Sequence, residues 1–72
     1  KPGLQDKVNL CRRHIDLEIE HRGADQANKI MRKFYGGYFK GFEGAARLRH
    51  DLVTATTINA AVGILQRFEE TL

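Results

Sequence analysis

Apolar residues recur at three- and four-residue spacing along most of the chain, which is the spacing of one face of an α-helix. The first segment with this pattern covers residues 4–22. Its apolar positions are Leu4, Val8, Cys11, Ile15 and Ile19, with Leu10 and Leu17 as a second shoulder. Two cations, His21 and Arg22, are followed by Gly23, as is typical of the carboxyl end of a helix. The pattern therefore predicts a first helix over residues 4–22 with Gly23 as a left-handed cap.

Three further helices are expected. Asp25 can cap the second helix by accepting hydrogen bonds from the free amides of its first turn. Apolar and charged positions stay on opposite faces up to about Lys40, which predicts that this helix ends there. Residues 45–53 predict a short third helix after a glycine-rich connection. Thr54 or Thr56 can cap the fourth helix. Its apolar stripe consists of Ile58, Ala61, Val62, Leu65, Phe68 and Leu72.

Four helices joined by short loops predict an all-α fold, a small antiparallel four-helix bundle. The chain has 72 residues, which is enough for one domain with a single small core. Residues 1–3 read Lys-Pro-Gly, a turn-forming sequence, and are expected to be the end of a linker from a preceding domain. The expected helical domain covers residues 4–72.

Positive charge is concentrated in one stretch of the chain. Residues 29–49 hold six Lys or Arg and one Glu, a net charge of +5, whereas the whole chain carries +3. On a helical wheel the cations of the second helix share one quadrant, and Arg47 of the next helix extends the patch. We therefore expect contact with a polyanion through Lys29, Arg32, Lys33, Lys40 and Arg47. The alternative is an ordinary solvated face.

Four aromatic residues, Phe34, Tyr35, Tyr38 and Phe39, fall opposite these cations on the wheel. Packing in the bundle core is favoured over stacking on RNA bases, and the Tyr38 hydroxyl then needs a partner or access to water.

Arg49 falls on the apolar side of its helix. We expect it to be mainly structural and paired with an acidic residue of the first helix.

The sequence offers little to catalysis or metal binding. Cys11, His14, Glu18 and His21 lie along the first helix, but zinc usually takes four ligands at closer spacing, and Cys11 falls in the apolar stripe. The chain has no serine and no phosphate-binding loop, so we expect no catalytic, metal or cofactor residue in it. One cysteine and the lack of a long apolar run favour a soluble protein of the reducing cytoplasm.

The order of several motifs resembles a known family. The chain reads LxxKxxLCxxHIxL over residues 4–17, MRKFYGGYFKGFEGAARLRHDL over residues 31–52, and ends in an apolar helix. It is similar to the C-terminal helical domain of bacterial tRNA-dihydrouridine synthases, flavin-dependent enzymes of the NifR3-like group. The resemblance covers nearly the whole chain and is most specific at residues 31–33, 38–41 and 44–49.

This resemblance implies a parent enzyme with an N-terminal TIM barrel that binds FMN and uses NAD(P)H to reduce uridine to dihydrouridine in tRNA. The present domain would help to hold the tRNA. The implied partners are tRNA and the barrel of the same chain, without DNA or membrane, in the cytoplasm. The catalytic cysteine of the family belongs to the barrel and is not Cys11.

Two functions remain open at this point. In the first, the chain is an RNA-binding accessory domain whose second helix lies along tRNA phosphates, and Gly36 lets the backbone approach because it has no side chain. In the second, it is a helical protein-interaction module whose basic face docks an acidic partner or its own catalytic barrel.

Overall fold

The structure is a computed structural model that describes residues 3–72; Lys1 and Pro2 of the expected linker lie outside the described residues. Over residues 3–72 the chain forms five α-helices and no strand. They are α1 (Leu4–Arg22), α2 (Ala24–Met31), α3 (Tyr35–Tyr38), α4 (Ala45–Thr54) and α5 (Ile58–Glu70). The all-α fold expected from the sequence is confirmed.

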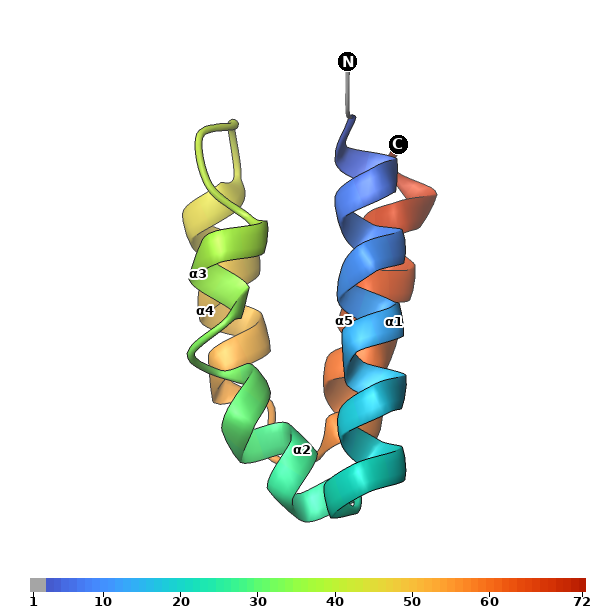
Figure 1. Ribbon diagram of the computed structural model, residues 1–72. Helices are drawn as coiled ribbons and strands as arrows, with labels where there is room; N and C mark the ends of the chain where they lie inside the picture. The colour runs from blue at the N-terminus through green and yellow to red at the C-terminus, as the bar shows by residue number, and fades with distance from the viewer. Residues whose placement is uncertain (1–2) are drawn as a thin grey trace.

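The helices form an up-and-down bundle (Figure 1). Helices α1 and α5 run antiparallel and in contact on one side, while α3 and α4 form the other side. Helix α2 crosses the base of the bundle and joins the two sides. Together α2 and α3 take the place of the single second helix expected from the sequence, so the antiparallel order is kept although the number of helices differs.

The second expected helix is interrupted at residues 32–34. There the hydrogen bonds tighten to three-residue spacing, with the Lys33 N–H donating to the Ile30 carbonyl at 3.3 Å and the Phe34 N–H to the Met31 carbonyl at 2.9 Å. Helix α3 contains both Gly36 and Gly37, which disfavour helix, and it lasts only four residues. The expectation of one helix to about Lys40 is therefore wrong.

The junction between α1 and α2 is made by one glycine. Gly23 has φ 83° and ψ 163°, so its φ is positive as expected, but its ψ is not that of a left-handed cap. Its carbonyl accepts the Ala27 N–H at 3.0 Å, which starts α2 at Ala24 and leaves Asp25 inside the first turn. Asp25 is consequently not the cap that the sequence suggested.

The start of α5 also differs from the expected one. The Thr57 hydroxyl accepts the Ala60 N–H at 3.1 Å and caps the helix, in place of Thr54 or Thr56. Thr54 belongs to the last turn of α4, where its hydroxyl donates to the His50 carbonyl at 2.7 Å. Helix α4 is one residue longer than predicted, which removes Thr54 from the following cap.

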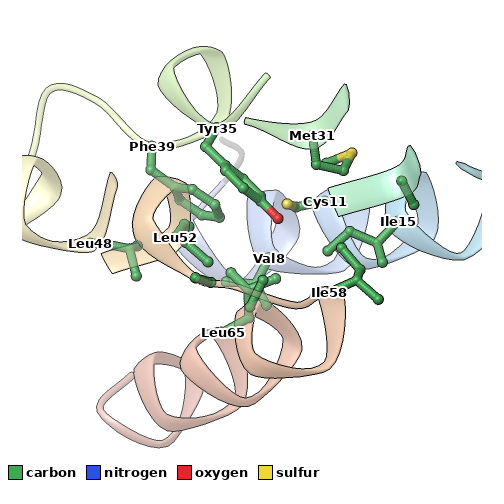
Figure 2. Close-up of a cluster of buried hydrophobic side chains, with 13 residues drawn as sticks. Val8, Cys11, Ile15, Met31, Tyr35, Phe39, Leu48, Leu52, Ile58 and Leu65 are labelled. Carbon is green, nitrogen blue, oxygen red and sulfur yellow. The ribbon is translucent and has the colours of Figure 1, made fainter. Parts of the chain in front are cut away.

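A single core lies between the helices (Figure 2). Its buried side chains are Val8, Cys11, Ile15, Ala27, Met31, Tyr35, Phe39, Leu48, Leu52, Ala55, Ile58, Ala61 and Leu65. Tyr35 points inward toward Cys11, and burial raises the pKa of the Cys11 thiol to about 12. Cys11 is thus a packed thiol.

Leu10 and Leu17, the second shoulder of α1, stay exposed. No helix within residues 3–72 is long and apolar enough to cross a bilayer.

Candidate nucleic-acid interface

The five cations expected to contact a polyanion are all exposed, but they come from several elements. Lys29 lies in the last turn of α2, Arg32 and Lys33 in the turn that follows, Lys40 in the α3–α4 loop, and Arg47 on α4. We call these five residues the cationic surface.

The helical wheel holds for one part of this surface. Arg32 keeps helical backbone angles, φ −53° and ψ −39°, so Lys29, Arg32 and Lys33 still follow one another at the end of α2. Beyond α3 the chain is extended at Phe39, with φ −121° and ψ 90°. The prediction that Lys40 shares a quadrant of the same helix is wrong, because Lys40 is not helical.

The cations at 29–40 are exposed and form no ion pairs among the described residues, a property they share with Arg13 and Arg67, but here four such cations fall within twelve residues. The structure pairs Arg12 with Glu69 at 3.0 Å and Arg22 with Glu18 at 2.9 Å. None of the ion pairs among residues 3–72 involves the cations of the segment 29–40. Those cations are Lys29, Arg32, Lys33 and Lys40. Their charge is consequently not compensated by a neighbouring carboxylate.

Arg47 is the exception within the cationic surface. Its Nε lies 3.5 Å from Asp51 Oδ1, one helical turn along α4, and its side chain is 84% exposed. An ion pair so exposed contributes little to stability. Arg47 therefore stays accessible to an external anion.

Arg49 is placed differently from the expectation. It is half-buried, but its Nη1 donates to the Phe39 carbonyl at 2.7 Å and not to a carboxylate of α1. Its stem passes Gly36 of α3, where an added Cβ would lie 3.9 Å from Arg49 Cδ. The predicted acidic partner is wrong. Arg49 instead fastens α4 to the end of α3, directly before Lys40.

The loop that carries Lys40 is built on two glycines. Gly41 and Gly44 have φ of 79° and 87°, a region that residues with a side chain rarely adopt. Between them Phe42 is half-buried, with its ring centroid 5.8 Å from that of Phe68 on α5. The two glycines permit the tight turn, and the contact of Phe42 with Phe68 anchors the loop that follows Lys40 to α5.

His14 connects α1 to α3 beside the cationic surface. Its Nε2 lies 3.2 Å from Glu18 and its Nδ1 lies 3.0 Å from the Tyr38 hydroxyl. Because a carboxylate only accepts, Nε2 carries a proton that it donates to Glu18; when the ring is neutral, Nδ1 accepts from the Tyr38 hydroxyl. Burial, with a smaller contribution from Cys11, raises the pKa of the Tyr38 hydroxyl. Tyr38 thus has the partner that its position in the bundle requires.

Phe34 is a further candidate for RNA contact, although its position on the helical wheel predicted that it would pack in the core. Its side chain is 40% exposed, and its ring meets the His14 ring edge-on at a centroid distance of 4.7 Å. Tyr35 and Phe39 are buried as expected, and Tyr38 is half-buried. Phe34 departs from them because the interruption at residues 32–34 turns it outward, next to Lys33. Helical periodicity carries no signal for that interruption.

Comparison with known proteins identifies similar sequences. A probable tRNA-dihydrouridine synthase of Staphylococcus epidermidis is 34% identical over 67 residues, and one of Staphylococcus aureus is 30% identical over 66 residues. Each alignment covers 90% of this chain but only 20% of the relative. No family model matches the chain, and no solved structure matches it significantly. The chain is thus related in sequence to one segment, a fifth of the length, of proteins with this name.

Proposed function

We propose that residues 4–72 form a tRNA-binding accessory domain of a tRNA-dihydrouridine synthase. In this proposal the cationic surface lies on the phosphate backbone, with Lys29, Arg32, Lys33, Lys40 and Arg47 as contact residues. The observation that carries it is the clustering at 29–40 of four cations that are exposed and form no ion pair within residues 3–72. A cation without a carboxylate neighbour can bind a phosphate without first breaking an internal pair.

The similarity to staphylococcal proteins supports tRNA as the polyanion, because those relatives are named for tRNA. The remaining four-fifths of such a protein would supply the chemistry: a TIM barrel with FMN, reduced by NAD(P)H, that converts uridine to dihydrouridine in the cytoplasm. We assign no FMN ligand and no catalytic residue to the present chain. Its role in the proposal is to bind and orient the substrate.

The kinds of side chain on the cationic surface indicate which part of the RNA it contacts. Three of the five residues are lysines, each a point charge on a flexible stem, which suits contact with phosphates. Phe34, exposed beside Lys33, adds one ring on which a base can stack without regard to its identity. Binding through this surface is therefore expected to show little preference for base sequence.

The test is the variant Lys33→Glu/Lys40→Glu, with binding to tRNA measured by fluorescence anisotropy across a salt series. Both residues are exposed, so the melting curve should change little while tRNA binding is abolished. For the unaltered chain the logarithm of the affinity should fall with the logarithm of the salt concentration at a slope of about −3, if roughly four phosphates are neutralised.

The control is Lys7→Glu/Arg13→Glu, which changes the net charge by the same amount on α1. It should weaken binding far less, because neither residue belongs to the cationic surface. If Lys33→Glu/Lys40→Glu binds tRNA as the unaltered chain does, or if both double variants lose affinity equally, the proposed interface is wrong.

A second function, docking of a protein partner or of the catalytic barrel, is favoured by a different surface. Leu10 and Leu17 are 57% and 47% exposed and lie seven residues apart on one face of α1. A contiguous exposed apolar patch marks a contact surface, and in this second function the two leucines would form part of one. Leu10→Gln/Leu17→Gln would leave tRNA binding unchanged under the first proposal and would abolish partner binding under the second.

A further inference from the structure

Helices α4 and α5 leave an open groove between them that extends beyond the cationic surface. Two adjoining hollows, of about 330 Å³ and about 460 Å³, make up this groove. Asp51, Ile64 and Arg67 line both hollows and join them into one. The smaller hollow is also lined by Arg47, Leu48 and Phe68. We call this feature the α4–α5 groove.

The floor of the smaller hollow is apolar and firmly supported. Leu48 is buried, and Ile64 and Phe68 are half-buried against the core. The ring of Phe68 packs on that of buried Phe39, with centroids 6.1 Å apart. Because the core holds these side chains from below, the floor is set before any ligand arrives. An apolar floor of this kind suits the face of a planar ring.

The rim of the groove is positively charged. Arg67 and Arg47 are exposed, and Asp51 is the one carboxylate in the lining of either hollow. Arg67 reaches into both hollows and takes part in no ion pair among the described residues. A guanidinium binds phosphate through paired donors and also stacks on bases. The groove thus joins an apolar floor to an available arginine.

We propose that the α4–α5 groove binds one unpaired nucleotide of the RNA, with the base on Ile64 and Phe68 and the phosphate on Arg67. The inference rests on the proposed function, since it requires an RNA ligand. The smaller hollow, of about 330 Å³ and open to solvent, can receive the face of one ring without enclosing it. Bases inside a duplex are stacked and paired, so only a loop, a bulge or an end can supply the nucleotide.

An acidic amphipathic helix is the rival occupant, and the shape of the groove argues against it. Helix-in-groove recognition uses apolar anchors spread over several turns of the bound helix. Leu48 and Phe68 lie only in the smaller hollow, Ile64 lies between the two hollows, and the larger hollow is otherwise lined by threonine, alanine and charged residues. A single ring fits such a floor better than a helix does.

The experiment compares two RNAs and two matched variants of the chain. The RNAs are a hairpin with an unpaired loop and a blunt duplex made from the same stem. Arg67→Gln removes the charge at the groove, and Arg13→Gln removes an exposed arginine of α1 outside both the groove and the cationic surface. Arg67→Gln should weaken hairpin binding about fivefold or more, because the phosphate of the unpaired nucleotide loses its charged hydrogen-bond donors. Its effect on the duplex should not exceed that of Arg13→Gln.

A second measurement uses uridine monophosphate alone as the probe. It should shift the NMR methyl signals of Leu48 and Ile64 and leave those of buried Val8 in place. Equal loss of hairpin and duplex binding in Arg67→Gln would make Arg67 a plain phosphate contact and overturn the inference. A glutamate-rich peptide that shifts Leu48 and Ile64 where uridine monophosphate does not would overturn it in favour of protein docking.

Failure of this inference is distinguishable from failure of the proposed function. If Lys33→Glu/Lys40→Glu loses both RNAs and Arg67→Gln changes neither, the groove assignment is wrong and the cationic surface stands. If Lys33→Glu/Lys40→Glu binds both RNAs normally, the cationic surface is wrong. Hairpin-selective loss in Arg67→Gln still supports the groove in that case.

Discussion

The link between Arg49 and the Phe39 carbonyl gives a prediction that separates a structural role from an RNA contact. Arg49→Met keeps most of the stem beside Gly36 but removes the donor that lies 2.7 Å from the carbonyl oxygen. The end of α3 and the start of the Lys40 loop then lose their fastening to α4. We expect the variant to be less stable and the loop to be less well ordered.

The size of the effect follows from the kind of bond. A hydrogen bond from a charged donor contributes about 1.5–3 kcal/mol, and we take the lower end because Arg49 is only half-buried. In a domain of this length about 1.5 kcal/mol lowers the melting temperature by roughly 6–12 °C. This is less than expected for a broken buried ion pair, because no carboxylate is left without its partner.

Thermal unfolding followed by circular dichroism measures this change, with Arg13→Met as the matched control. Arg13 is exposed and forms no ion pair within residues 3–72, so its variant should melt with the unaltered chain. tRNA affinity, measured well below both melting temperatures, should fall only slightly in Arg49→Met. An unchanged melting temperature together with a large loss of tRNA affinity would refute the reasoning and make Arg49 an RNA contact.

Two further predictions concern the core. Tyr35→Phe should raise the free energy of unfolding, measured in urea, by about 1 kcal/mol. The reason is that the Tyr35 hydroxyl is buried without a hydrogen-bond partner among the described residues. A variant less stable than the unaltered chain would show that this hydroxyl does form a hydrogen bond. The Cys11 thiol has its pKa raised from 9.0 to about 12, so the folded state holds this proton more tightly than the unfolded state. The contribution of the Cys11 thiol to the free energy of unfolding should therefore be complete below pH 9. Above pH 9 this contribution should decline by up to about 1.4 kcal/mol per pH unit. Urea titrations across that range should show a shallower decline in Cys11→Ala, and equal declines in the two proteins would contradict the assignment.

The sequence by itself determined the helical class, the limits of α1 and most of the core. Residues 4–22 form a helix because their apolar positions follow the helical period and a glycine ends them, which are local properties of the chain. Val8, Cys11 and Ile15 are buried for the same reason. The five residues of the cationic surface could likewise be named from the concentration of positive charge along the chain. The order of motifs pointed to the tRNA-dihydrouridine synthases before any comparison, and the related staphylococcal proteins carry that name.

Only the tertiary structure decided where the second helix breaks and what that break exposes. Periodicity continues through residues 32–34, but the chain forms a turn there, α3 follows as a separate short helix in contact with α1 and α4, and Phe34 turns outward. The hydrogen-bond partner of Arg49, the Phe39 carbonyl, could not be predicted from the sequence either. The two residues are ten positions apart, and their contact depends on how α4 packs beside the end of α3. The α4–α5 groove belongs to two helices at once. Such features arise between elements, and a pattern along one element contains no information about them.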